Sequence, residues 1–108
     1  GASKGSGLGH DFLRHIQRAG VLIHLVEPVP DDGTDAMTNY RTIRQELVEF
    51  DKTLGERPEI VVITKADLPE AEAVQKEFSE ALQKDVFLIS AATGQGLREL
   101  SEAVYAAI

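Results

Sequence analysis

Three short apolar runs, rich in β-branched residues, alternate with amphipathic segments along the 108 residues of this chain. The runs, at 21–26, 60–63 and 86–89, have the length and composition of strands that are buried on both faces of a sheet. Strands that alternate with helices are joined by right-handed crossovers and form a parallel sheet. A strand–helix–strand unit takes ~30 residues, so we expect about three parallel strands. The predicted fold class is α/β, as part of a doubly wound parallel sheet.

Four helices are expected around this sheet, over 10–19, 36–54, from Pro69 onward and from 97 to the end of the chain. Gly20 and Gly55 are placed to end the first two. Apolar side chains recur at helical spacing on each helix, and these are expected to face inward. They are Phe12, Leu13, Ile16, Tyr40, Ile43, Leu47, Phe50, Leu54, Val74, Phe78, Leu82, Leu97, Leu100, Val104 and Ile108.

Composition excludes several function classes. Eighteen acidic residues against eleven Lys and Arg give a net charge of −7, which argues against a nucleic-acid binder, because binding to phosphates depends on basic residues. No apolar run approaches the ~20 residues that a membrane span needs, so no membrane partner is expected. The absence of cysteine excludes disulfides and thiolate metal sites, and it suits the cytoplasmic location that we expect.

The histidines and a cluster of aspartates are weaker candidates for a site. The three histidines follow no metal-ligand spacing, and His24, inside an apolar run, is predicted to be a core histidine. Asp31, Asp32 and Asp35 either hold a cation or favour the start of the helix at residue 36, where acidic side chains suit the positive end of the helix dipole.

Polar residues follow the second and third predicted strands. Thr64-Lys65-Ala66-Asp67 follows one strand and Ser90-Ala91-Ala92 follows the next. Ligands of open parallel sheets bind beyond the carboxyl ends of the strands, where these segments meet. A carboxylate such as Asp67 can accept hydrogen bonds from N1–H and the 2-amino group of guanine, and adenine has neither donor. The stem of Lys65 can lie along the base, and a backbone N–H of the 90–91 turn can donate to guanine O6.

A structural interpretation of the same residues stays open. Asp67, with Glu70 three residues later, is also a pattern that caps the start of a helix. Thr64 and Ser90 are common turn residues at the ends of strands.

The glycine-rich start of the chain is more specific. Gly1-Ala2-Ser3-Lys4-Gly5-Ser6-Gly7-Leu8-Gly9-His10, with Phe12-Leu13-Arg14-His15-Ile16 after it, closely resembles the Obg/CgtA family of GTPases. In that family such a stretch follows an Asp-x-Pro-Gly motif and forms switch II and its helix. The resemblance continues through Glu56-Arg57-Pro58, Thr64-Lys65-Ala66-Asp67-Leu68-Pro69-Glu70, Ser90-Ala91-Ala92 and Gly96-Leu97-Arg98-Glu99-Leu100, and thus spans essentially the whole chain.

The resemblance implies a P-loop GTPase-like fold and a guanine-binding set. Its members would be Thr64, Lys65, Asp67, Ser90, Ala91 and Ala92. Thr64 replaces the family's usual Asn, which ties this loop to the P-loop. The switch II-like residues would be Gly1, Ala2, Ser3, Gly5, Gly7 and Gly9. Residues 1–19 would form the switch II-like loop and helix, and 20–108 the base-recognition half of the G domain.

The phosphate-binding motifs of such GTPases do not occur in these 108 residues, which contain neither Gly-x-x-x-x-Gly-Lys nor Asp-x-x-Gly. We therefore expect the carboxyl-terminal part of a G domain, inactive by itself, with its Mg²⁺ ligands outside this chain. The whole protein would hydrolyse GTP to GDP and act on a ribosomal particle during ribosome assembly.

The alternative is a non-enzymatic α/β module that binds protein or RNA. The first strand would be an exposed edge that permits a non-native dimer.

Overall fold

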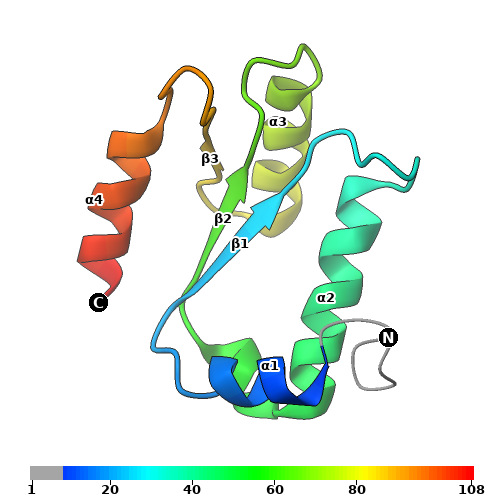
Figure 1. The fold of residues 1–108 in the computed structure, drawn as a ribbon, viewed down its shortest axis with the longest axis vertical. Helices are drawn as coiled ribbons and strands as arrows, with labels where there is room; N and C mark the ends of the chain where they lie inside the picture. The colour runs from blue at the N-terminus through cyan, green and yellow to red at the C-terminus, as the bar shows by residue number, and fades with distance from the viewer. Residues whose placement is uncertain (1–8) are drawn as a thin grey trace.

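The computed structural model describes residues 9–108, except for the side chains of His10 and His15. Its strands β1 (Leu22–Val26), β2 (Glu59–Ile63) and β3 (Phe87–Leu88) form one parallel sheet in the order β1-β2-β3. Helices α2 and α3 lie on one side of the sheet and α4 lies on the other (Figure 1). The predicted fold class, an α/β protein with three parallel strands and four helices, is confirmed.

The helices are α1 (His10–Ile16), α2 (Ala36–Phe50), α3 (Ala71–Leu82) and α4 (Leu97–Ala107), with a short 3-10 helix η2 (Lys52–Glu56) after α2. Within residues 9–108, no helix has the length and apolar character that a membrane crossing requires.

The helix predicted over 36–54 ends earlier than expected, at Phe50. Asp51 is extended (φ −156°, ψ 113°), and its carboxylate accepts a hydrogen bond from the Thr53 N–H at 3.0 Å. This local hydrogen bond starts η2, so Gly55 lies inside a 3-10 helix and does not end α2. Leu54 is nevertheless buried as predicted, because η2 places it in a cluster with Leu13 and Leu47.

Other boundaries also differ from the predictions by a few residues. α1 ends at Ile16 and not at residue 19, and α3 begins at Ala71, two residues after Pro69. β3 is shorter than the predicted strand at 86–89. The Val86 carbonyl before it accepts a hydrogen bond from the Gln75 side chain of α3 at 2.7 Å.

The core has two parts. The main cluster joins α2, α3 and the sheet and contains Val26, Ala36, Tyr40, Val61, Ile63, Ala71, Phe78 and Val86. A second cluster of Leu13, Leu47 and Leu54 joins α1, α2 and η2. The apolar stripes predicted on α2 and α3 therefore do face the core.

The stripe on α4 does not face inward as a whole, and Phe12 on α1 is also half exposed. Leu97 and Ile108 are 42% and 81% exposed, and no residue of α4 is buried. Ile23 and Leu25 of β1 are exposed as well. They lie on the opposite face of the sheet from the α2–α3 core, because side chains alternate along a strand. The helix thus covers only part of this face.

Two of the three aspartates before α2 accept hydrogen bonds from nearby backbone groups, and one of them caps the helix. Asp35 is its N-cap residue and accepts a hydrogen bond from the Thr38 N–H at 3.0 Å, while Asp32 accepts one from the Thr34 N–H at 3.1 Å. The bond to Asp35 is that of an N-cap residue, whereas the bond to Asp32 closes a turn in the loop before the helix. Among residues 9–108, no group of three or more His, Asp or Glu side chains is arranged to hold a metal ion.

Arg57 attaches α1 to the start of β2. Its guanidinium donates to the carbonyls of Ala19 and, at 3.0 Å, of Gln17, just after the helix ends. Gln17 in turn donates to the Asp51 carboxylate at 2.8 Å. The guanidinium presents a fork of N–H donors, which suits it to hold two carbonyls of the turn after α1 at once.

A cluster of charged side chains surrounds Glu59 at the amino end of β2. Its Oε1 accepts from the Tyr40 hydroxyl at 2.6 Å and lies 3.2 Å from Lys84 Nζ. Its Oε2 lies 3.3 Å from Arg44 and 3.5 Å from His24 Nδ1. The His24 ring also packs on Tyr40, with 4.7 Å between ring centroids, as predicted for a core histidine.

The partners of Glu59 outweigh the effect of its burial. Burial favours the neutral acid and would raise its pKa. The hydrogen bonds from His24 and Tyr40 and the charges of Arg44 and Lys84 favour the carboxylate, and they lower the pKa of Glu59 from 4.5 to about 2. Burial, together with the hydrogen bond to Glu59, raises the pKa of the Tyr40 hydroxyl.

This cluster predicts a loss of stability in acid. A carboxyl group whose pKa is lower in the folded chain stabilises the fold above its ordinary pKa, and that stabilisation is lost as the pH falls from about 4.5 towards 2. We expect Glu59→Gln to lower the free energy of unfolding by about 1.5–3 kcal/mol at neutral pH and to remove most of this pH dependence. Urea denaturation at steps between neutral pH and pH 2 measures both effects.

The matched control is Glu80→Gln, which removes one exposed carboxylate from α3. It should keep the wild-type stability at neutral pH and the wild-type slope in acid. If Glu59→Gln and wild type lost stability in parallel across the acid range, the role given to Glu59 would be wrong.

Candidate functional site

The carboxyl ends of the three strands meet at one edge of the sheet (Figure 1). Val26 is paired with Ile63, and Ile63 with Leu88, so the residues that follow the strands lie next to one another. The structure therefore brings together the two segments that the sequence placed at strand ends. We call Thr64, Lys65, Asp67 and Ser90, which lie along this edge, the rim.

The turn at residues 64–67 is attached to both neighbouring strands. The N–H and the hydroxyl of Thr64 both donate to the Val26 carbonyl, at 2.9 and 3.2 Å. The Ala66 N–H donates to the Ile89 carbonyl at 2.8 Å. Thr64 therefore binds the end of β1 through its hydroxyl as well as its backbone.

Lys65 has an unusual backbone conformation. Its φ is +54°, in the left-handed region, which costs a residue with a side chain ~1–2 kcal/mol. Its ammonium lies 3.6 Å from Glu27 Oε1, and both side chains are about half exposed. The ion pair thus crosses the rim from β2 to β1. Glu27 was not among the residues predicted for the site, although it directly follows a strand, and the rule that selected Thr64 and Ser90 would have found it.

Ser90 orients the carboxylate of Asp67. Ser90 is fully buried, and its hydroxyl donates to Asp67 Oδ1 at 3.1 Å while accepting from the Thr93 N–H at 3.2 Å. Asp67 itself is exposed. A carboxylate has about four acceptor positions, so one hydrogen bond from Ser90 leaves it able to accept from a ligand with two donors.

The structure does not use Asp67 to cap α3. The N-cap residue of that helix is Glu70, and it makes no side-chain capping hydrogen bond. Asp67 is instead held by Ser90, 23 residues further along the chain. The capping interpretation of the Asp67–Glu70 pattern is therefore wrong.

The loop after β3 is closed by its own backbone. The Ser90 N–H donates to the Gln95 carbonyl at 3.0 Å, and the Gly94 N–H donates to the Ser90 carbonyl at 2.8 Å. Ala91 and Ala92 are exposed on this loop. Gly96 (φ +76°) ends it, and a Cβ there would lie 2.1 Å from the Leu88 carbonyl oxygen, so only glycine fits.

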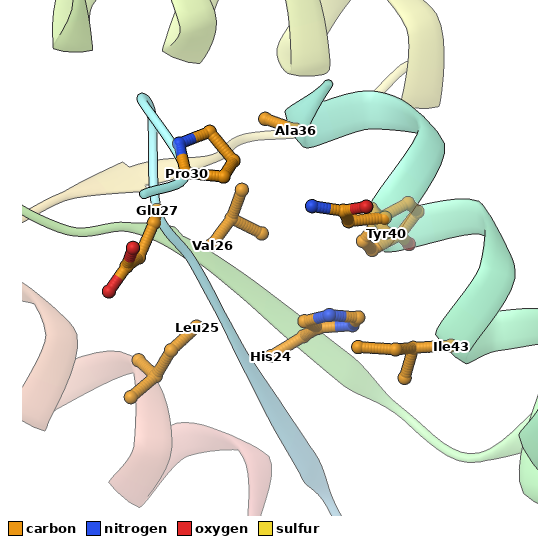
Figure 2. A pocket seen from close by; sticks show the side chains of 9 residues that line it. His24, Leu25, Val26, Glu27, Pro30, Ala36, Tyr40 and Ile43 are labelled. Carbon is orange, nitrogen blue, oxygen red and sulfur yellow. The ribbon is translucent and has the colours of Figure 1, made fainter. Parts of the chain in front are cut away.

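A pocket of about 240 Å³ lies beside the rim, between β1 and α2 (Figure 2). His24 and Val26 point toward α2 on one side of β1, whereas Leu25 and Glu27 point to the other side. Glu27, the partner of Lys65 in the ion pair, lines this pocket, whereas Lys65 and the other rim residues do not. The rim is thus an open edge next to the pocket.

Most of the predicted switch II-like residues lie outside the described residues, namely Gly1, Ala2, Ser3, Gly5 and Gly7. Gly9 has a φ of +82° and directly precedes α1. Its carbonyl accepts from the Leu13 N–H at 3.1 Å, as the residue before a helix does.

The fold and the rim define a parallel α/β protein with polar groups at the carboxyl edge of its sheet. Among curated proteins, the chain is 49% identical over 98 residues to GTPase Obg of Elusimicrobium minutum. It is 50% identical over 102 residues to GTPase Obg of Bacillus velezensis, and 47% over 107 residues to that of Desulfatibacillum aliphaticivorans. By its sequence the chain belongs to the Obg family of GTPases, as the resemblance predicted.

These matches differ in how much of each protein they cover. They include 90%, 93% and 98% of this chain, but 21%, 24% and 32% of the three relatives. The chain therefore spans between about a fifth and a third of the length of the curated relatives it matches. No protein-family model matches the chain.

The contacts of Ser90 predict a measurable structural role. Ser90→Ala removes the hydroxyl that joins Asp67 to the Thr93 N–H, so we expect about 1 kcal/mol less stability and faster hydrogen exchange at the Thr93 amide. Urea denaturation and amide exchange measure these effects. Ser101→Ala, an exposed serine on α4, is the control and should change neither. An unchanged Thr93 amide in Ser90→Ala would contradict the role of this hydroxyl.

Proposed function

We propose that the rim binds the guanine base of GTP or GDP. The supporting observation is the geometry of Asp67, an exposed carboxylate that a buried serine holds in place at the carboxyl edge of a parallel sheet. Asp67 accepts hydrogen bonds from N1–H and the 2-amino group of guanine. Adenine would leave it unpaired, and an unpaired polar group in a site costs more than its pairing contributes.

Other residues of the site surround the base in this proposal. The aliphatic stem of Lys65 lies along one face of the base, while the ion pair with Glu27 holds its ammonium at the rim. Ala91 and Ala92 supply backbone N–H groups to guanine O6, and their small side chains leave room for a flat ring. Thr64 keeps the turn attached to β1.

For the whole protein we propose the activity of a GTPase, which hydrolyses GTP to GDP and phosphate. The names of the relatives, GTPase Obg, support this proposal. These 108 residues contain no P-loop motif, which supports a division of the G domain between this chain and a further segment. The chain would be the carboxyl-terminal part of an Obg-type G domain. The groups that bind the phosphates and Mg²⁺ would lie outside it, and the chain alone would not hydrolyse GTP. We further propose a cytoplasmic protein that acts on a ribosomal particle.

Nucleotide titrations test the base site. Calorimetric titration of the 108-residue chain with GDP, ADP and XDP should show weak binding, with GDP at least tenfold tighter than ADP and little dependence on Mg²⁺. Asp67→Asn should weaken GDP by about tenfold or more and favour XDP, because xanthine presents a carbonyl where guanine carries its amino group. A longer protein that restores the phosphate-binding motifs should bind GDP tightly with the same selectivity.

Glu70→Gln is the matched control, since it removes an exposed carboxylate three residues from Asp67. It should leave the preference for GDP unchanged. Equal affinity of the longer protein for GDP and ADP would refute guanine recognition and favour the non-enzymatic interaction module. Tight, Mg²⁺-dependent binding of GTP by the 108 residues alone would refute the division of the site between this chain and a further segment.

A further inference from the structure

A groove runs along β3, which lies between α3 and α4 (Figure 1). Two adjoining cavities of about 500 and 400 Å³ form it, and Gln75, Val86 and Phe87 line both. The first cavity extends along α3 to Glu80, and the second extends to Glu99 near the start of α4. We call it the β3 groove. No residue of the rim lines it, so it is separate from the candidate guanine site.

The backbone of β3 directs two pairs of polar groups into this groove. The Ile89 N–H donates to the Ile63 carbonyl at 2.9 Å, and the Ile89 carbonyl accepts from the Ala66 N–H at 2.8 Å, so both groups of Ile89 point toward β2. Backbone groups point to alternate sides along a strand. The N–H and carbonyl groups of Leu88 and Val86 therefore point away from β2, and both residues line the second cavity.

The two carbonyls on this side are already in contact with other parts of the chain. The Val86 carbonyl accepts from the Gln75 side chain at 2.7 Å. Gly96 covers the Leu88 carbonyl, since a Cβ there would lie 2.1 Å from its oxygen. Regular pairing with a further strand uses donors and acceptors alike, so it would first have to break these contacts.

The two N–H groups on this side are donors that point into the groove. Among residues 9–108, no turn, loop or side-chain group accepts a hydrogen bond from the Val86 or Leu88 N–H. The groove thus presents two donors, two residues apart, to a ligand that carries acceptor groups.

The charges of the groove exclude an anionic ligand. Glu80 and Asp85 line the first cavity and Glu99 lines the second, against Lys76 as the single basic residue in the two linings. All four side chains are exposed, and the half-buried ring of Phe87 lies between the two acidic positions. A groove with this charge repels phosphates and carboxylates and attracts cations. The ligand that fits has neutral acceptors and positive charge, which an extended peptide with basic side chains combines.

We propose that the β3 groove binds an extended, lysine- or arginine-rich segment of another protein. Carbonyl groups of the segment accept from the N–H groups of Val86 and Leu88. Its side chains alternate between the α3 side and the α4 side, because it is extended. Basic side chains therefore reach Glu80 on one side and Glu99 on the other. This contact does not depend on the guanine site.

A titration followed by NMR tests the backbone contact. The ¹⁵N-labelled chain is titrated with the capped peptide acetyl-Lys-Val-Lys-Lys-Val-Lys-amide. We expect saturable shifts and slower hydrogen exchange at the amides of Val86 and Leu88, because both gain an acceptor. The same peptide with glutamate in place of lysine should not bind. Spermidine, which has positive charge but no carbonyl, should not slow exchange at these amides.

Two charge reversals on α4 test the position of the contact. Glu99→Lys should raise the dissociation constant of the lysine peptide by about tenfold, because like charges then meet in the groove. Glu102→Lys is the matched control, since it changes the net charge equally, at an exposed position on the same helix that does not line the groove. It should leave the constant nearly unchanged. Circular dichroism verifies that both variants are folded.

Several results would overturn the proposal. An equal effect of Glu102→Lys would mean that the peptide is attracted only by the overall acidity of the chain. Unchanged exchange at Val86 and Leu88, or equal protection by spermidine, would remove the backbone contact. If the peptide left these two amides unchanged in a longer protein of the family, a segment of that protein itself would cover the groove.

Discussion

Parallel pairing between β1 and β2 is the constraint on which the rest of this structure depends. Its register runs from Leu22 opposite Glu59 to Val26 opposite Ile63. At the amino end, that register sets His24 beside the Glu59 carboxylate and the Tyr40 hydroxyl. At the carboxyl end it lets Thr64 donate twice to the Val26 carbonyl. A shift by one residue would turn every side chain of β1 to the other face and break both arrangements.

The two ends of the sheet use polar groups in different ways. The Glu59 carboxylate is 93% buried and surrounded by cations, so it holds the fold together and has little access to a ligand. Asp67 is exposed, and only its buried partner Ser90 is removed from solvent. A buried donor that orients an exposed acceptor is the arrangement a recognition site needs, because the acceptor is fixed in position yet can still be reached. This difference supports the assignment of the carboxyl edge, and not the charged cluster, as the binding site.

The second face of the sheet is only partly covered. α2 and α3 bury one face completely enough to form the main core, whereas α4 has no buried residue and leaves Ile23 and Leu25 exposed on the other. The curated relatives extend well beyond the segment that this chain matches, and a longer family member has further chain available for the same surface.

The sequence by itself determined the alternation of strands and helices, the parallel sheet and the family. These depend on apolar periodicity, strand length and local motifs, which are properties of neighbouring residues. It also placed Thr64, Lys65, Asp67 and Ser90 at strand ends. Only the tertiary structure decided that Ser90 holds Asp67, that Glu27 pairs with Lys65, and that α2 ends at Phe50, where Asp51 starts a new turn. Likewise, apolar spacing predicted an inward stripe on α4, but how much of it is buried depends on the surface that the sheet offers. Such contacts join residues distant in the chain, and their geometry arises only when the strands pair.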